Sequence, residues 1–412
     1  MTISVGKWFR IRYNKITGSI AFYPAAIAIG FLLLSWVMLH IDFSSWGRQF
    51  KSSVSWISLK DASTARSIVS TVAGAIISLT VFSFSMVMIV LNQAASQMSN
   101  RVLSSMIENR FQQIVLGFYI GTIVYALFLL STIRDINSGV YVPALSIYLL
   151  ILLTVIDIFL FIYFLDYVTQ TVKYETIINR VRKQTMDTMK MKFTEAIDET
   201  VSWHGLNSTV IFTDESGYYQ GFNKKILLKL AADKNIHIAI LHNEASYLLK
   251  GTAIMMVYHT KKIDDDCMKK IVSSADFFKG QPIETNAEYG FHQLAEVAIK
   301  ALSPGINDPA TAVISLHALS DLLSYRLYHH LPLVINDTNK NARIVRRSSS
   351  FNDLFEKCIH PIWNYGEKDQ YIQNELIEMM KQLKNADYKN SYHNIFDNMI
   401  IKIENQKKAA IA

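Results

Sequence analysis

Several signatures of catalysis and metal binding are missing from this chain of 412 residues. Its only cysteines, Cys267 and Cys358, share no metal-ligand spacing, and we expect both to be buried thiols in a reducing compartment. The chain has no phosphate-binding glycine loop, no His-Glu-x-x-His motif and no nucleophile elbow. The sequence therefore predicts no cofactor and no metal site, and it does not favour an enzyme.

Charge is also scarce, because only 18% of the residues are charged, and the net charge is +7. Much of the excess positive charge lies beside long apolar runs, so it does not indicate a nucleic-acid partner. Residues 20–168 are mostly apolar, whereas residues 173–412 have the composition of a soluble protein. This division predicts a membrane protein with a four-helix transmembrane domain, followed by a cytosolic α/β domain with a helical C-terminal part.

Four apolar runs are long enough to cross a bilayer as helices. They cover about residues 20–40, 66–92, 113–133 and 142–168. Lysine and arginine are concentrated before the first run and after the fourth. By the positive-inside rule, this distribution predicts a multi-pass protein of the cell (inner) membrane with both termini in the cytoplasm. The lipid bilayer is then an obligatory partner.

Four further segments complete the predicted domain organisation. Residues 1–19 alternate aromatic and basic side chains, which suits a segment lying along the inner leaflet; a disordered basic leader is the alternative. Residues 170–200 have apolar side chains at helical spacing and predict an amphipathic stalk helix. Residues 201–285 follow the pattern of a small α/β domain, and residues 286–412 that of a helical domain.

The second apolar run contains a stripe of small and polar residues. At 100° per residue, all members fall within about 40° of one line along a helix. The members of the stripe are Ser67, Thr71, Gly74, Ser78, Ser85, Asn92 and Ser96. Polar groups turned toward hydrocarbon lack hydrogen-bond partners, so the stripe should face protein or water.

Two interpretations of the stripe stay open at this point. Small residues at four-residue spacing allow close helix–helix packing. Alternatively, the stripe is the water-facing wall of an oligomeric pore, or of a cavity within one bundle. In a pore, Phe82 with Met88 or Ile89, near the same face, would form a hydrophobic constriction.

Asp157 is the only acidic residue well inside an apolar run. An ionisable residue inside a membrane span is a functional candidate by default. The alternative is a structural carboxyl group that is hydrogen-bonded to a hydroxyl on another helix. The sequence alone does not decide between these two roles.

A loop with the sequence Ser-Pro-Gly-Ile-Asn-Asp-Pro separates two predicted helices near residue 300. Pro304 and Gly305, after Ser303, should end the first helix. Asp308 is well placed as the N-cap of the second helix, with Pro309 at its first position. Helix capping explains most of this motif, but Asn307 and Asp308 beside a helix N-terminus are also candidates for holding a small ion or ligand.

Two stretches resemble a bacterial family of predicted integral membrane proteins that is catalogued as a domain of unknown function. The first runs from Ile68 to Leu103, and the second, Tyr289 to Ala312, carries the ALSPGINDPxTA motif. The resemblance covers most of residues 20–330. Family members usually have proline at the position of Asn100, which leaves the local loop shape open. The resemblance implies a four-span architecture with a cytosolic domain, and it implies no activity.

These observations favour an oligomeric pore or transport protein that is lined by the second span and regulated by its cytosolic domain. Such a protein would be a homo-oligomer and would handle a small ion or ligand. The alternative is a membrane-anchored ligand-binding or scaffold protein without conduction, in which the 303–309 loop makes the contact. An enzyme that acts on lipid or a small metabolite at the inner face of the membrane is a third class.

Overall fold

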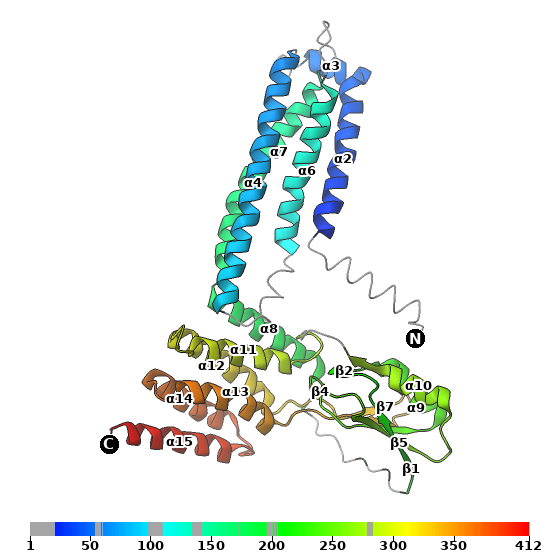
Figure 1. The fold of residues 1–412 in the computed structure, drawn as a ribbon, viewed down its shortest axis with the longest axis vertical. Coiled ribbons are helices and arrows are strands. Elements are labelled where there is room, and N and C mark those ends of the chain that lie inside the picture. Colours follow the sequence, from blue (N-terminus) through cyan, green and yellow to red (C-terminus); the bar gives the residue numbers. More distant parts are fainter. Residues whose placement is uncertain are drawn as a thin grey trace. The chain divides into compact units, whose positions relative to one another are not determined.

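The computed structural model describes residues 21–53, 61–97, 110–133, 142–171, 173–195, 205–277 and 283–411, with a few single residues between them. The basic N-terminal segment predicted for residues 1–19 lies outside this set. The chain divides into two compact units, one with the apolar helices up to Lys173 and one from Tyr174 onward. Figure 1 shows the helices and strands of both units.

The first unit contains the four apolar helices expected from the sequence, each long and apolar enough to cross a membrane. They are α2 (Phe22–Phe43), α4 (Ala62–Gln97), α6 (Arg110–Thr132) and α7 (Ala144–Thr171). The start of α4 is fixed by Asp61, whose carboxylate accepts hydrogen bonds from the amides of Ser63 and Thr64.

A short helix that the sequence analysis missed, α3 (Ser45–Ser53), follows α2 almost directly. The hydroxyl of Ser44 accepts a hydrogen bond from the amide of Gly47 and so caps the first turn of α3. Trp46 and Phe50 stack on each other on an exposed face of this helix. The other helices of this unit were predicted from long apolar runs, and α3 is too short to contain one.

Helices α2 and α6 approach each other closely because α6 has glycines at the contact. A Cβ atom added to Gly117 would lie 2.6 Å from Ile27 Cδ1, and one added to Gly121 would lie 2.7 Å from Phe31 Cγ. The two glycines are four residues apart and therefore lie on the same face of α6. The spacing allows Ile27 and Phe31 of α2 to pack directly against the α6 backbone.

The second unit begins with α8 (Tyr174–Lys192), which lies in the predicted stalk. Ile178, Val181 and Met189 are buried, and α8 packs against α11 (Glu288–Ala301) and α12 (Pro309–Arg326). Ile197, another residue of the predicted stalk, lies outside the described residues. The described part of the stalk is therefore a packed helix of the second unit.

The strands form two sheets. The larger has the order β1-β5-β3-β8-β7, in which β3 and β8 are parallel and the other pairs are antiparallel. Its strands are β1 (Asn207–Phe212), β3 (His237–Ile240), β5 (Ala253–His259), β7 (Val334–Asn336) and β8 (Ala342–Val345). The smaller sheet joins β4 (Tyr247–Leu248), β2 (Gly217–Phe222) and β6 (Ala275–Phe277).

The larger sheet combines the two soluble regions that the sequence analysis separated at residue 285. Strands β7 and β8 come from the predicted helical domain, yet β8 pairs with β3 of the predicted α/β domain. Helices α9 (Lys224–Lys234) and α10 (Asp265–Ser274) contribute Leu227 and Ile271 to the core of this sheet. The two regions therefore share one folded unit.

The C-terminal helices are α13 (Phe351–Gly366), α14 (Gln370–Ala386) and α15 (His393–Ile411). A capping box starts α13, in which Ser350 and Asp353 each accept a hydrogen bond from the other's backbone amide. Asp369 caps α14 through the amides of Tyr371 and Ile372. Helix α13 packs against α11 and α12, α14 packs against α12, and α15 packs against α14.

Candidate functional site

The predicted stripe on the second span lies on the exposed side of α4. Its members with described side chains are all exposed: Ser67, Thr71, Gly74, Ser78, Ser85 and Asn92. Ser96 is helical, but its side chain lies outside the described part of the structure. The opposite side of α4 is buried, through Ala65, Val69, Ala73, Ile76 and Ser83. Within one chain, the described stripe residues therefore neither pack against other helices nor line an internal cavity.

The serine hydroxyls on this exposed face donate hydrogen bonds to backbone carbonyls of α4 itself. Ser78 donates to the carbonyl of Gly74 (3.0 Å), and Ser85 donates to the carbonyl of Val81 (2.9 Å). The remaining lone pairs of both hydroxyls point outward, where they can accept from water or contact a cation. The surface is also open at Gly74, because an added Cβ atom would meet no atom within 4 Å.

The large apolar residues that were predicted to form a constriction are exposed, as the stripe residues are. Phe82, Met88 and Ile89 all have exposed side chains, and so does Val81. In a single chain these side chains would contact lipid. In an assembly with α4 at its centre, the same side chains would narrow the path beside the serines.

Asp157 lies in the core of the helix bundle, beside polar side chains of α6. Thr122 of α6 is its immediate neighbour. Tyr119, also on α6, is close enough to Asp157 for an electrostatic interaction, and the Tyr119 hydroxyl neighbours that of Ser83 on α4. All four side chains are completely buried. We call these four residues the intramembrane polar cluster.

No oxygen atom of this cluster makes a hydrogen bond of normal distance and angle with a described residue, although Thr122 faces Asp157 and Ser83 faces Tyr119. This holds for both carboxylate oxygens of Asp157 and for the hydroxyls of Ser83, Tyr119 and Thr122. Buried polar groups without partners are rare, and each costs about 1–3 kcal/mol. Such a group of oxygens is a site that a ligand, an ion or a proton would complete.

The sequence analysis identified Asp157 but missed its three partners. A signal for Ser83 was present, because it falls about 160° from Ser67 on the helical wheel of the second span, opposite the stripe. Tyr119 and Thr122 are three residues apart, a spacing that puts both on one face of a helix. Nothing local indicates that these faces meet Asp157, since helix pairing is decided by packing along whole helices.

The 303–309 loop is a capped turn between α11 and α12. Asp308 accepts hydrogen bonds from the amide (3.1 Å) and the hydroxyl (2.6 Å) of Thr311, so it is the N-cap of α12. Asn307 has a φ of 48°, in the left-handed region that asparagine tolerates well. The amide of Asn307 donates to the carbonyl of Ser303 (2.9 Å). These bonds occupy the carboxylate of Asp308 and the backbone amide of Asn307.

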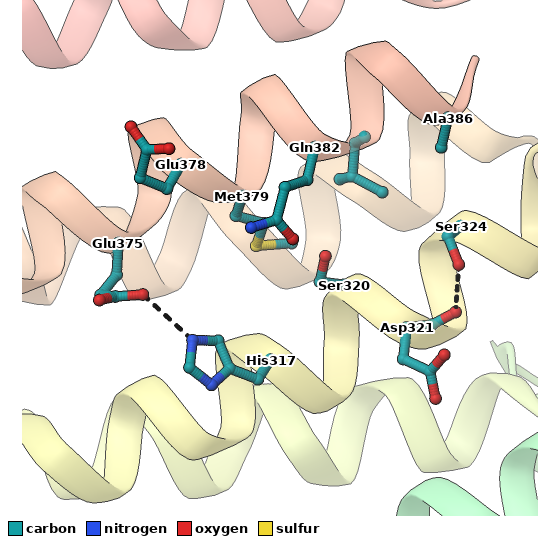
Figure 2. A pocket seen from close by; sticks show the side chains of 10 residues that line it. His317, Ser320, Asp321, Ser324, Glu375, Glu378, Met379, Gln382 and Ala386 are labelled. Carbon is teal, nitrogen blue, oxygen red and sulfur yellow. Dashed lines mark hydrogen bonds and ion pairs between the residues drawn. The ribbon is translucent and has the colours of Figure 1, made fainter. Parts of the chain in front are cut away.

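A pocket of about 560 Å³ lies between α12 and α14 (Figure 2). Its wall includes three carboxylates, and each has a basic partner. Glu375 contacts His317 (3.1 Å), Asp321 contacts Arg182 (2.5 Å), and Glu378 contacts Lys381 (2.7 Å). Asp321 and Glu378 are therefore ion-paired, whereas the charge of Glu375 is balanced only when His317 is protonated.

A second group of ionisable side chains surrounds Glu244 in the second unit. Burial raises the pKa of Glu244, and the nearby cations Arg346 and Lys192 oppose this shift. Burial also lowers the pKa of Lys192. The fully buried hydroxyl of Tyr219 has no hydrogen-bond partner in the described parts of the chain, and burial raises its pKa. Glu244, Lys192 and Tyr219 therefore form one group whose pKa values are shifted mainly by burial.

Comparison with known proteins places these features in a family context. The model of a family described as "Predicted membrane protein (DUF2254)" matches residues 17–382. Uncharacterized proteins of Mycobacterium bovis and Mycobacterium tuberculosis are each 23% identical to the chain over 327 residues. The alignments cover 77% of this chain and 63% of each mycobacterial protein. No solved structure matches the chain.

Proposed function

Because the chain belongs to the DUF2254 family of predicted membrane proteins, we propose that its four apolar helices cross the cell (inner) membrane and leave both termini in the cytoplasm. The distribution of lysine and arginine around the apolar runs supports this orientation. The second unit, with its mixed α/β fold, is then cytosolic.

The proposed activity is transport of a small ion by an assembly of several copies of this chain, with α4 lining the path. One observation carries this proposal: the polar stripe of α4 is turned away from the other helices of its own chain. Hydrocarbon offers no hydrogen-bond partner to Thr71 or to the outward lone pairs of Ser78 and Ser85. A second copy of the chain, or water held between copies, would provide such partners.

Regulation by the second unit is part of the same proposal. Helix α8 begins at Tyr174, only three residues after α7 ends at Thr171. The two helices are therefore separated by only two residues in the sequence. The packing of α8 on α11 and α12 would then couple a change in the second unit to the spans.

The experiment that tests transport uses cysteine modification in the full-length chain. Native Cys267 and Cys358 are both buried, so a charged, membrane-impermeant methanethiosulfonate should leave the wild type unmodified. Ser85→Cys places a thiol on the stripe. Phe84→Cys is the matched control, because Phe84 is exposed but points about 100° away from Ser85.

We expect the wild type to show discrete conductance in planar bilayers, and the reagent to alter the conductance of Ser85→Cys but not of Phe84→Cys. Thiols react with this reagent only where water ionises them, so reaction at residue 85 alone identifies the hydrated face. Absence of conductance across voltage and membrane tension, in a protein verified as folded, would overturn the proposal. The stripe would then be a packing seam or a lipid-facing surface, and a scaffold role would be the remaining reading.

A further inference from the structure

The intramembrane polar cluster has the composition of a cation site. The geometry points to binding of one monovalent cation, of the Na⁺ type, by Asp157, Thr122, Tyr119 and Ser83 in the core of the helix bundle. This inference goes beyond the proposed transport function and does not depend on it. The proposed cation site is separate from the stripe, because Ser83 lies on the opposite, buried side of α4.

The first argument is the chemistry of the cluster. Its polar atoms are five oxygens, two from the carboxylate and three from hydroxyls, and it includes no nitrogen. Hard cations prefer oxygen ligands of these kinds. The oxygens come from α4, α6 and α7, so an ion at this position would be held by three helices.

The second argument comes from the orientation of the hydroxyl groups. A serine or threonine inside a membrane helix usually donates to the carbonyl one turn earlier. Thr80, on α4, and Thr154, on α7, do so through the carbonyls of Ile76 (2.7 Å) and Leu150 (2.8 Å). Ser83 and Thr122 make no such bond among the described residues, although a carbonyl is equally available to them.

The surroundings of Ser83 and Thr122 differ from those of Thr80 and Thr154. Ser83 and Thr122 are completely buried, and each adjoins another member of the cluster. Turning a hydroxyl away from the helix backbone leaves it without a bond unless something else in the cluster interacts with it. A bound cation would contact the lone pairs of both hydroxyls together with the Asp157 carboxylate.

The third argument is charge balance. An ionised carboxylate in a bundle core is costly unless a positive charge accompanies it. The cluster contains one acid and no base, so a single positive charge neutralises it. A divalent ion would leave an excess of one charge, and Mg²⁺ would additionally require near-octahedral coordination with several waters. A buried water would fill the space but leave the carboxylate charge uncompensated.

The position within the helices also suits ion movement. Asp157 lies near the middle of α7, and Ser83 lies well inside the candidate span of α4. Ion sites of membrane transporters commonly lie near the middle of the bilayer, between helices that can move apart. A site composed of residues from three helices would be disrupted or completed by a shift of any one of them.

The test is equilibrium binding of radioactive sodium to the purified full-length protein in detergent, with choline chloride keeping the ionic strength constant. The pH is set high enough to ionise a carboxylic acid. Asp157→Asn removes the charge with little change of shape, and Thr122→Val removes one hydroxyl at similar volume. Thr154→Val is the matched control, because its hydroxyl lies on α7 but bonds to its own helix.

We expect saturable binding by the wild type and by Thr154→Val. Asp157→Asn should raise the half-saturating sodium concentration at least about tenfold, equivalent to about 1.4 kcal/mol, and Thr122→Val should raise it by a smaller factor. Absence of saturable binding by folded wild type, or equal binding by Asp157→Asn, would overturn the inference. A cluster that takes only a proton would give the first of these results.

Two readouts keep this inference separate from the transport proposal. If Asp157→Asn does not fold, the double variant Ser83→Ala, Thr122→Val replaces it in the same assay. We expect the same rise in the half-saturating sodium concentration. Sodium binding without conductance would overturn transport and leave the site intact. Conductance that persists in the wild type without sodium binding would overturn the site alone.

Discussion

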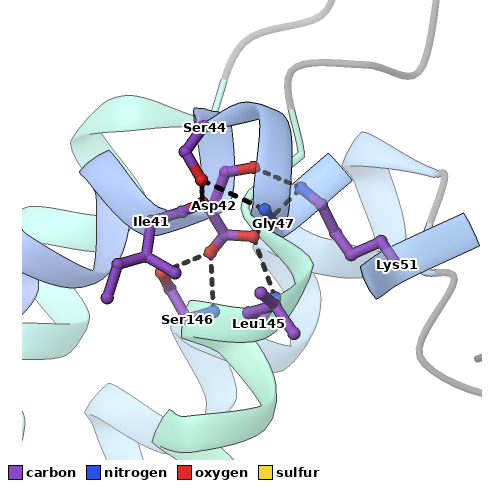
Figure 3. Close-up of polar contacts among 7 residues, drawn as sticks. All are labelled: Ile41, Asp42, Ser44, Gly47, Lys51, Leu145 and Ser146. Carbon is purple, nitrogen blue, oxygen red and sulfur yellow. Dashed lines mark hydrogen bonds and ion pairs between the residues drawn. The ribbon is translucent and has the colours of Figure 1, made fainter. Parts of the chain in front are cut away.

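Asp42, near the end of α2, accepts hydrogen bonds from both the backbone amide (2.8 Å) and the hydroxyl (2.5 Å) of Ser146, near the start of α7. Its other oxygen accepts from the amide of Leu145 (3.1 Å) and contacts the ammonium of Lys51 on α3 (3.1 Å) (Figure 3). A residue of one helix thus caps another, because the first amides of α7 have no partner in their own helix. One buried carboxylate connects α2, α3 and α7.

Replacement of Asp42 by alanine should therefore destabilise the first unit. The change leaves the amides of Leu145 and Ser146 buried without an acceptor, and we expect a loss of about 2–4 kcal/mol. Thermal unfolding of the full chain in detergent measures it. Asp42→Asn is the comparison: its side-chain oxygen can still accept a hydrogen bond from the start of α7, so its effect should be clearly smaller. Equal losses in the two variants would contradict a capping role for Asp42.

Enlarging the glycines of α6 should separate α2 from α6. Gly121→Val would push branched methyl groups into the ring of Phe31, and overpacking of this kind costs about 1–3 kcal/mol. Gly30→Ala on α2 is the control, since its added Cβ meets no atom within 4 Å and alanine favours a helix. Thermal unfolding should show a lower midpoint for Gly121→Val alone. An unchanged midpoint would mean that the two helices are not in close contact.

The 303–309 loop can be tested for a role beyond capping. Asp308→Ala removes the N-cap of α12 and should cost about 1 kcal/mol, whereas Asp308→Asn should be nearly neutral because asparagine caps equally well. Thermal unfolding of both variants tests the structural part. If Asp308→Asn keeps full stability but loses transport, the carboxylate charge has a use other than capping, and the ligand hypothesis for this loop gains its first support.

Glu244 should make the second unit less stable as the pH rises. Its folded-state pKa lies above the ordinary value of 4.5 because of burial, so the folded state holds this proton more tightly than the unfolded state does. The resulting stability is present below pH 4.5 and is lost as the pH rises through the folded-state pKa. Glu244→Gln should flatten this slope at pH values above 4.5, measured by thermal unfolding.

The exposed Asp214 provides a matched comparison for that experiment. Asp214→Asn removes a carboxylate that solvent already surrounds, so the decline in stability with rising pH should persist in this variant. A decline that is as steep in Glu244→Gln as in the wild type would assign the pH dependence to another group.

Local patterns account for much of what the sequence predicted correctly. The four apolar helices were predicted because a bilayer-spanning helix requires about 20 apolar residues in succession, and such a run can be read directly from the sequence. Asp308 and Pro309 could be placed at the start of a helix because capping involves neighbours within one turn. The family resemblance is likewise confirmed by the match over residues 17–382.

The sequence by itself determined that Ser67, Ser78 and Ser85 share one side of α4, because helical periodicity is a local property. Only the tertiary structure decided that this side points away from the other helices, that Tyr119 and Thr122 lie beside Asp157, and that Ser83 adjoins Tyr119. It also joined β8 to β3 across the predicted domain boundary. These relationships depend on which surfaces pack together, and packing is chosen by the whole set of helices and strands at once.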